Sequence, residues 1–427
     1  MPDQSKQNPV IIAGAGPVGL TLALLLHENG IPVEIYETVS EIRPLGVGIN
    51  LLPHSVRVLH GLDLEARLDE FAIRTSALNY CNKFGQQIWS EPRGIDAGYP
   101  FPQYSIHRGN FQIFLSEIAQ ERIGKEHFHF GHTLVDWRNS SESIDENSTI
   151  DAIFRDQEGN NQSVIGRCLV AADGINSNAR KKLYPNEGDP IYGGRILWRG
   201  VTKAKPFLDG RTMFMAGHQD CKFVAYPICK ASHDDGNSLI NWIAELSLPD
   251  WTPELQDWNR EVPVEKFAQP FADWNFDWVN IPQLIDNAEK VFEFPLSDRN
   301  PVPSWRDGLM TLIGDAAHPM YPIGSNGASQ GILDAEKLAS ELCIDQSMDQ
   351  ALARYEEDRR PATAQIVLLN RKNGPEQVMQ LAEERAPDGF NDIEDVIPMS
   401  ERQDIADRYK QTAGFNLQAV KNKSQKK

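Results

Sequence analysis

Three glycines near the N-terminus have the spacing of a diphosphate-binding turn. Gly14, Gly16 and Gly19 follow a short apolar run and precede a leucine-rich stretch, which predicts a strand, a tight turn and a helix. The first glycine of such a turn permits the bend, the second lets the backbone approach the phosphates, and the third lets helix and strand pack closely. The positive end of the helix favours the phosphate charge. A turn without a ligand is the alternative interpretation.

Glu37 supports a ligand at this turn because it ends the next apolar run, at residues 31–37, about 20 residues after the first glycines. A carboxylate at that place accepts the ribose hydroxyls of a dinucleotide, and it repels a 2′-phosphate. The stretch therefore predicts a site for FAD or NAD.

Two further acids stand at the ends of apolar runs. Asp173 and Asp315 each follow a predicted buried strand, and the carboxyl ends of such strands are where open α/β sheets bind ligands. An Asx-turn that caps the next helix is a second role for Asp173, and both roles can hold at once. Gly327 and Ala328 begin another predicted helix, whose N-terminus favours negative charge on a ligand. For His318, between these elements, a structural role in the turn is favoured over a catalytic base.

Other candidates have less specific surroundings. Arg108 precedes a predicted helix, where it could clamp a phosphate or only cap and solvate the helix. Arg43, Gly46 and Gly48 lie in a loop-like stretch, 43–50, whose glycines would let the backbone pass close to something flat. A plain loop is the alternative there.

Residues 186–300 change in character, because helical periodicity weakens and aromatic-rich strand candidates follow one another at 195–201, 212–216, 222–228 and 239–246. We interpret them as a mostly antiparallel sheet. Alternation places Tyr226 on one face with Val224 and Ile228, and Phe223 and Ala225 on the other. Tyr226 has a polar tip that can orient an aromatic ring. The further pocket candidates are Trp198, Arg199, Met213, Met215, His218 and Phe223, and core packing is the alternative for each.

Composition excludes several classes of protein. The 427 residues carry a formal charge of −18, which argues against nucleic acid or an anionic membrane as the main partner. No apolar run is long enough to span a bilayer, and residues 1–9 show no signal peptide. Five cysteines without a C-x-x-C pair favour free thiols in the cytoplasm, and we predict no metal site. Only the lysine-rich tail, 421–427, is expected to be disordered.

The glycine turn with Glu37, Asp173-Gly174 and Gly314-Asp315 together resemble the fingerprints of the single-component (class A) FAD-dependent aromatic monooxygenases, whose type member is p-hydroxybenzoate hydroxylase. The order and spacing match over most of residues 8–365. Residues 197–201 and 321–329 are most similar to the branch that holds 5-methylphenazine-1-carboxylate 1-monooxygenase.

The resemblance implies an α/β fold. It would contain a Rossmann-like FAD-binding domain of the glutathione-reductase type, an inserted, mostly antiparallel β-sheet substrate domain and a helical C-terminus. The FAD-binding domain would comprise residues 1–75, 105–185 and 300–370. The substrate domain would comprise residues 76–104 and 186–299, and the C-terminal helical segment and tail residues 371–427.

The resemblance also implies roles for residues. The three glycines would bind the FAD diphosphate, Glu37 the adenosine ribose, and Arg108 and Asp315 the ribityl chain. Asp173 would serve FAD and the transient nicotinamide donor. The stretch 322–327 would lie along the flavin ring, although Ser325, Asn326 and Ser329 depart from the commoner G-Q-G-x-N pattern. The residues expected to act are Gly14, Gly16, Gly19, Glu37, Arg43, Gly48, Arg108, Asp173, Asp315, Gly327 and Ala328 for FAD, Pro322, Gly324 and Tyr226 in catalysis, and Trp198, Arg199, His218 and Tyr226 for substrate.

The implied activity is hydroxylation of a small aromatic compound, phenazine- or salicylate-like, through a flavin hydroperoxide. Non-covalent FAD would be the cofactor, and NADH or NADPH and O₂ the co-substrates, in a cytoplasmic monomer or homodimer. One alternative is an epoxidase, halogenase or reductase of the same fold, although the W-x-W-x-I-P motif of halogenases is absent. Another is a flavin-free binding protein on the same scaffold, such as the Rab-escort type, which lacks an acid like Asp315.

Overall fold

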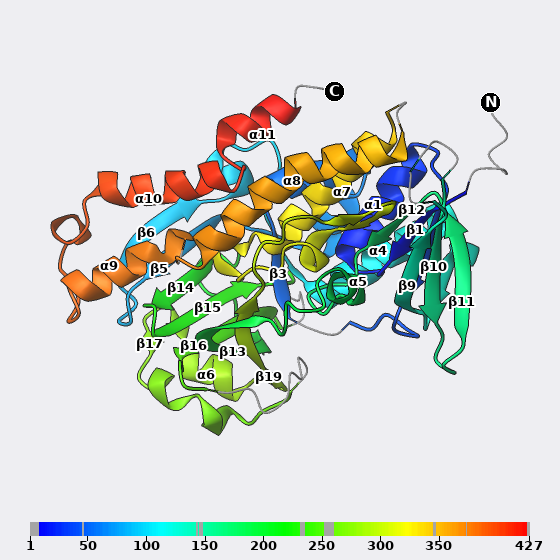
Figure 1. Cartoon of the computed structure of the whole chain (residues 1–427). Coiled ribbons are helices and arrows are strands. Elements are labelled where there is room, and N and C mark those ends of the chain that lie inside the picture. Colours follow the sequence, from blue (N-terminus) through cyan, green and yellow to red (C-terminus); the bar gives the residue numbers. More distant parts are fainter. Residues whose placement is uncertain are drawn as a thin grey trace.

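Two large β-sheets and a set of C-terminal helices make up the fold (Figure 1). The computed structural model describes residues 8–44, 47–141, 144, 148–230, 235–251, 260–344, 347–372 and 374–424. Gly46, expected to pass close to a ligand, lies outside these residues.

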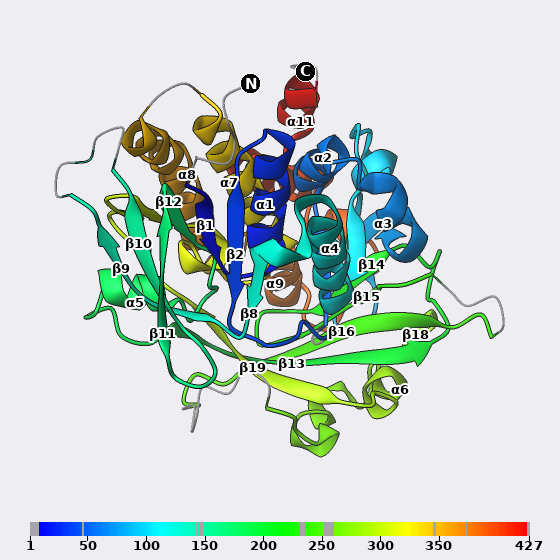
Figure 2. The same ribbon diagram turned by 90° about the vertical axis from the view of Figure 1, so that its right-hand side faces the viewer.

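The first sheet has the strand order β20-β21-β12-β1-β2-β8, and only the β20–β21 pair is antiparallel. Figure 2 shows it between helices α1 and α4 on one side and a smaller sheet, β9 to β11, on the other. Its strands are β1 (Val10–Ala13), β2 (Val33–Glu37), β8 (Phe128–Phe130), β12 (Cys168–Ala171), β20 (Arg306–Asp307) and β21 (Met310–Leu312); the smaller sheet contains β9 (Thr133–Asn139), β10 (Ile150–Arg155) and β11 (Asn161–Gly166).

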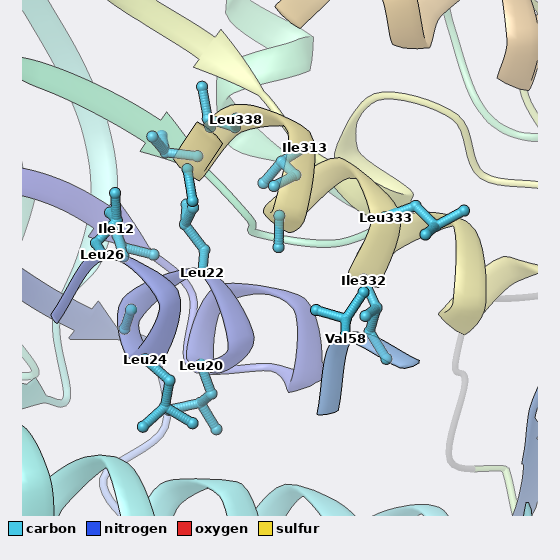
Figure 3. Packing of buried hydrophobic residues seen from close by; sticks show 14 of the residues in the cluster. Ile12, Leu20, Leu22, Leu24, Leu26, Val58, Ile313, Ile332, Leu333 and Leu338 are labelled. Carbon is cyan, nitrogen blue, oxygen red and sulfur yellow. The ribbon is translucent and has the colours of Figure 1, made fainter. Parts of the chain in front are cut away.

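Helix α1 (Pro17–Glu28) forms as its sequence predicts. Pro17 occupies the first turn, where its missing N–H removes no helical hydrogen bond, and Gly30 beyond the C-terminus has a positive φ of 70°. Its leucines pack on Ile12 of β1 and near Ile332 of α7 (Gly327–Leu342), as Figure 3 shows. Burying each such side chain contributes about 1.5–3 kcal/mol, so this packing fixes the turn that joins β1 to α1.

The second sheet has the order β19-β13-β16-β15-β14-β5-β6, and every pair is antiparallel except β14 with β5. The prediction of a mostly antiparallel sheet is thus confirmed. One face packs against segment 262–291, and the other carries a separate apolar cluster with Tyr226. The strands are β5 (Ala77–Cys81), β6 (Gln87–Pro92), β13 (Ile191–Ala204), β14 (Met213–Gly217), β15 (Cys221–Pro227), β16 (Ser238–Ser247) and β19 (Val291–Asp298).

A third sheet corrects the expected loop at 43–50. Residues Gly48–Leu51 form strand β3, paired antiparallel with β7 (Tyr104–His107), which also pairs with β4 (Ile73–Arg74). The backbone groups of β3 are satisfied by a partner more than 50 residues away, and its four residues carry no alternation long enough to predict a strand. The helices beside it are α2 (Pro53–Gly61), α3 (Glu65–Phe71) and α4 (Arg108–Ile123).

The C-terminal helices lie along both sheets. Helix α8 (Met348–Asn370) packs on α7, and α9 (Gln377–Arg385) continues over β5, β6 and β14 (Figure 1). The expected disorder of the tail is corrected in part, because α11 (Leu417–Ser424) includes its first residues and packs on α2; residues 425–427 lie outside the described chain. No helix among the described residues is long and apolar enough to cross a bilayer. The remaining helices are α5 (Asn178–Leu183), α6 (Ile281–Asp286) and α10 (Met399–Thr412).

Candidate active site

A cavity of about 700 Å³ is lined by residues of both large sheets. The carboxyl ends of β1, β2, β12 and β21 contribute the glycine turn and the three predicted acids, and one face of β13 to β16 forms the opposite part of the wall. The start of α7 and a single residue of the C-terminal segment, Glu376, complete it.

The glycine turn opens into this cavity. Gly14 has a φ of 117°, and a side chain there would overlap the carbonyl oxygen of Ala172. A Cβ on Gly16 would meet no atom within 4 Å, so it would project into the space that a diphosphate needs. Gly19 does not line the cavity; a Cβ there would overlap Gly14, so its role is close packing. No side chain of the described residues caps the N-terminus of α1, which leaves its first N–H groups to a ligand.

Glu37 lies directly against the turn and lines the cavity beside it. Its Oε2 accepts a hydrogen bond of 2.7 Å from the Ala15 N–H, and its Oε1 accepts one of 3.0 Å from the Val39 N–H. Each carboxylate oxygen keeps a further lone pair for a ribose hydroxyl. Arg43 is not part of this arrangement, because its side chain is exposed and pairs with Glu41 at 3.1 Å, outside the cavity.

Asp173 has both of its predicted roles available. Its Oδ2 accepts from the N–H groups of Asn178 (2.8 Å) and Ala179 (3.3 Å), which begin α5. Its Oδ1 is buried and has no donor among the described residues. Burial raises the pKa of this carboxyl, against the hydrogen bonds that lower it. An orphaned buried oxygen beside the cavity fits a ligand hydroxyl or amide donor.

Asp315 follows β21, and its side chain is accessible and lines the cavity. Burial raises the pKa of Asp315, and the positive fields of His318 and Arg108 oppose that shift. Arg108, the first residue of α4, lines the same region. His318 instead pairs through Nε2 with the buried Asp334 at 2.5 Å and does not line the cavity, as a structural turn residue would.

The loop between β21 and α7 lies along the cavity with Pro322, Ser325 and Asn326, followed by Gly327 and Ala328. Within the described parts of the chain no side chain caps α7, so its N-terminus offers N–H groups and positive potential to the cavity.

Gly324 of this loop and Ser329 of the first turn of α7 do not line the cavity. Gly324 has a φ of 68°, and a side chain there would overlap the Tyr409 hydroxyl. Ser329, the departure from the expected asparagine, accepts from the Leu52 N–H at 3.0 Å and so joins α7 to α2.

The predicted alternation of the second sheet is confirmed. Val224 and Tyr226 line the cavity, and Phe223 and Ala225 lie in the cluster on the other face. Arg199 Nη2 donates to the Gly48 carbonyl at 3.4 Å, and its Nε has no acceptor among the described residues. Burial raises the pKa of Tyr226 to about 12, against a lowering by the hydrogen-bonded Arg199. The Tyr226 hydroxyl is therefore neutral at ordinary pH and can donate. The other lining residues of this wall are Leu197, Met215 and Ile243.

Two candidate substrate residues lie elsewhere. Trp198 is on the opposite face from Leu197 and Arg199, where it stacks on Phe267 with ring centroids 4.9 Å apart and donates to Glu293 at 3.0 Å. The alternation used for Tyr226 would have excluded it. His218 follows the end of β14, in the turn to β15, and its N–H donates to Cys221 at 2.9 Å, away from the cavity.

Three charged residues of the wall were not anticipated. Lys222 continues the alternation of Tyr226 by two steps, which is the signal that would have found it, and Glu245 lies opposite it on β16. Glu376 follows α8 in a segment without a recognisable motif. Gln112 also lines the cavity and donates to the Ala15 carbonyl at 2.9 Å.

The residues present fit FAD, because the open glycine turn, the uncapped helix ends of α1 and α7, and the orphaned oxygen of Asp173 surround one cavity. Comparison with known proteins agrees with this geometry. Residues 7–369 match the family model described as FAD binding domain.

The sequence similarity to named relatives covers most of the chain. Phenazine 1,6-dicarboxylic acid hydroxylase PhzS of Lysobacter antibioticus is 41% identical over 373 residues, covering 86% of this chain and 90% of the relative. The 3-amino-4-hydroxybenzoate 2-monooxygenase PtnB3 of Streptomyces platensis is 31% identical, covering 86% and 88%, and 3-hydroxybenzoate 6-hydroxylase 1 of Aquipseudomonas alcaligenes is 30% identical, covering 85% and 88%.

A solved salicylate hydroxylase substrate complex shares the fold with a TM-score of 0.72 at 19% identity, covering 99% of both chains. The chain belongs to this family of FAD-dependent aromatic hydroxylases and is itself an FAD-dependent monooxygenase that uses NAD(P)H and O₂ on a small aromatic substrate.

Proposed function

We propose that the protein hydroxylates a planar, carboxylated heteroaromatic compound of the phenazine type. The observation that carries this proposal is Arg199. Its guanidinium lines the cavity, and no carboxylate lies within ion-pair distance of it in the described part of the chain. A buried cation without a carboxylate partner in the wall of a cavity favours an anionic ligand group. The names of three relatives support an acid, since each is named for a carboxylated aromatic compound.

When FAD is bound, it supplies the redox chemistry that links NAD(P)H, O₂ and substrate. The protein supplies binding and electrostatics: the glycine turn with α1 holds the diphosphate, Glu37 the ribose, and Arg108 and Asp315 the ribityl chain. The N-terminus of α7 favours negative charge on the flavin ring. Asp173, with its free oxygen, would accept from FAD or from the nicotinamide donor.

Residues of the second sheet that line the cavity would orient the substrate. Arg199 would pair with the carboxylate, and the neutral Tyr226 hydroxyl would donate to a polar group of the ring. Leu197, Met215 and Ile243 would exclude water from the reacting face.

A substrate panel tests this proposal. NAD(P)H oxidation, hydroxylated product and peroxide are measured with phenazine, phenazine-1-carboxylate, phenazine-1,6-dicarboxylate and salicylate. We expect the phenazine acids to stimulate oxidation with product formed, and unsubstituted phenazine to stimulate it poorly. Arg199→Gln should reduce kcat/KM for the acids about 10- to 100-fold, the loss expected for a hydrogen-bonded charge worth about 1.5–3 kcal/mol.

Arg211→Gln is the matched control, because Arg211 belongs to the same sheet region but pairs with Asp96 outside the cavity. Equal turnover of phenazine and its acids, or equal effects of the two substitutions, would contradict the assignment of Arg199.

We also propose the domain boundaries, the cellular location and the oligomeric state of the protein. The domain boundaries remain those given by the sequence, at 75/76, 104/105, 185/186 and 299/300. All five cysteines are free, which supports a cytoplasmic location. A monomer or a homodimer is expected, and sedimentation of the holoenzyme distinguishes them.

A further inference from the structure

Four charged side chains meet on the second sheet at one end of the cavity. Lys222 Nζ lies 3.1 Å from Glu245 Oε2 and 2.5 Å from Glu376 Oε2, and Arg195 Nη1 lies 3.1 Å from Glu245 Oε1. All four residues are at most 9% exposed. We call them the Lys222 cluster; three of them, Lys222, Glu245 and Glu376, line the cavity.

Structural stability is a weak reason for such a cluster. Buried ion pairs are often no more stabilising than apolar side chains of similar volume. Burial would lower the pKa of Lys222, but Glu245 and Glu376 outweigh it and raise the pKa, so the ammonium stays charged. Charges kept in the wall of a ligand cavity are candidates for recognition.

Unused hydrogen-bonding capacity remains in the cluster. The Lys222 ammonium has three N–H donors; one is donated to Glu376, and Glu245 lies 3.1 Å from the nitrogen as an ion-pair partner. Glu376 Oε1 has no donor within reach among the described residues. The cluster as a whole is neutral, with two cations and two carboxylates. It therefore offers an N–H donor of Lys222 and the acceptor Oε1 of Glu376 side by side. Because its net charge is zero, it does not attract an anion.

The sheet register fixes how far this cluster lies from the other polar end of the wall. Lys222 lies opposite Glu245, Val224 opposite Ile243, and Tyr226 opposite Asn241. Tyr226 is the fourth residue after Lys222 on β15, which is roughly 13 Å along the strand. The Arg199 guanidinium belongs to the Tyr226 end, since it donates to Gly48, whose backbone packs on Tyr226.

The wall is thus polar at both ends and apolar between them. A single aromatic ring with one carboxylate on Arg199 leaves the Lys222 cluster without a partner, whereas two or three fused rings reach it. We infer that the Lys222 cluster is a second recognition subsite, which binds a neutral donor–acceptor substituent, a hydroxyl or carboxamide, at the far end of a fused-ring substrate. This inference rests on the proposed function, because Arg199 is taken as the anchor of the first carboxylate.

One residue of this subsite, Glu376, lies outside the residues that match the family model, 7–369. Glu376 ends the short segment Gly374–Glu376, after the last matched residue, 369. It is held there by the Lys222 pair and by α9, which packs on β5 and β6. The C-terminal segment therefore contributes directly to substrate selection.

Spectral titration of the flavin in the holoenzyme, without NAD(P)H, tests the inference. The probes are phenazine-1-carboxylate, its 6-hydroxy and 6-carbamoyl derivatives, and phenazine-1,6-dicarboxylate. The wild-type enzyme should bind the hydroxy and carbamoyl probes about tenfold more tightly than phenazine-1-carboxylate. Lys222→Met should reduce this advantage to about twofold or less.

Glu376→Gln removes a negative charge from the same cluster, whereas Lys222→Met removes a positive one. Removing that negative charge should tighten binding of the dicarboxylate and weaken binding of the carbamoyl probe, each about fivefold, a reversal that loss of packing alone does not produce. Glu383→Gln is the matched control, because Glu383 pairs with Lys83 at 2.7 Å and also joins α9 to the second sheet, but outside the cavity. It should change none of these affinities.

The outcomes separate the two proposals. If the wild-type enzyme binds no phenazine acid, both the proposed function and this inference are overturned. If the acids bind and Arg199→Gln weakens all of them, but Glu376→Gln leaves the ratio between the carbamoyl probe and the dicarboxylate unchanged with normal flavin content, only the second subsite is overturned.

Discussion

Tyr226 combines a packing role and a polar role in one side chain. Its ring belongs to the apolar cluster on the cavity face, and its hydroxyl bonds with Arg199. Tyr226→Phe keeps the ring and removes the hydroxyl. If the hydroxyl orients substrate, Tm and FAD content should stay unchanged while kcat/KM falls up to about tenfold or more peroxide is released per NAD(P)H, since one hydrogen bond between neutral groups contributes about 0.5–1.5 kcal/mol.

The control for this change is Tyr80→Phe. Tyr80 lies in the same apolar cluster, outside the cavity, and its buried hydroxyl has no partner among the described residues. If coupling, turnover and affinity are unaltered in Tyr226→Phe as in the control, Tyr226 only packs.

His54 makes the protein sensitive to acid. It is buried on α2 and stacks on Phe415, with ring centroids 5.5 Å apart. Burial and, to a smaller extent, the nearby cations Arg359, Lys423 and Arg57 lower its pKa to about 3, against a raising by Asn326.

The unfolded chain binds a proton at His54 below about pH 6.5, whereas the folded protein stays neutral there down to about pH 3. Stability is therefore lost as the pH falls from about 6.5, by up to about 1.4 kcal/mol per pH unit for this group. His54→Leu should lose less Tm than the wild type between pH 7.5 and 5.5. Equal losses in both proteins would contradict a neutral buried His54.

Elements with a local signal could be predicted from the sequence. The turn at Gly14 and the acids after β12 and β21 depend on neighbours within a few residues, so their strands and helices are found where expected. Strand β3 could not be predicted, because Gly48–Leu51 is a strand only through pairing with β7. From its position in the loop, Gly324 was predicted to lie against the flavin, but the loop turns it toward Tyr409 of α10. Tyr409 lies 85 residues later in the sequence, and no local pattern predicts this contact.

The contact between α10 and this loop has a measurable role. Tyr409 donates to the Ile323 carbonyl at 3.0 Å, and Asn370 at the end of α8 donates to the Tyr321 carbonyl at 3.0 Å. Gly324→Ala would place a methyl group on the Tyr409 hydroxyl and strain a positive φ, at a cost of about 1–2 kcal/mol for the φ alone. The loop should shift, and more peroxide should be released per NAD(P)H.

Gly414→Ala is the comparison, because Gly414 also has a positive φ (75°) and a Cβ there meets no atom within 4 Å. A rise in peroxide release confined to Gly324→Ala supports the role of the Tyr409 contact. Equal coupling in both variants would mean that α10 does not position the loop.

At the scale of the molecule, the cavity is assembled from parts that lie far apart in the sequence. The first sheet supplies the cofactor residues, the second sheet the opposite wall, and the C-terminal segment Glu376. The cofactor half could be predicted because each acid follows its own strand. The far end of the substrate half could not, since Glu376 meets Lys222 across 154 residues and has no local motif.

Because bound FAD would contact several of these parts at once, it should stabilise the whole protein by RT ln(1 + [FAD]/Kd). Glu37→Gln keeps a carbonyl oxygen for the Ala15 N–H but removes the charge that would bind the ribose. We expect about tenfold weaker FAD binding, and a smaller difference in Tm between the FAD-bound and FAD-free protein, with the Tm of the FAD-free protein nearly unchanged. Glu34→Gln, on the same strand but paired with His127 and His129 outside the cavity, is the control. If both variants retain the wild-type Tm difference, Glu37 does not bind the cofactor, and the ribose must be held by other residues at the carboxyl end of β2.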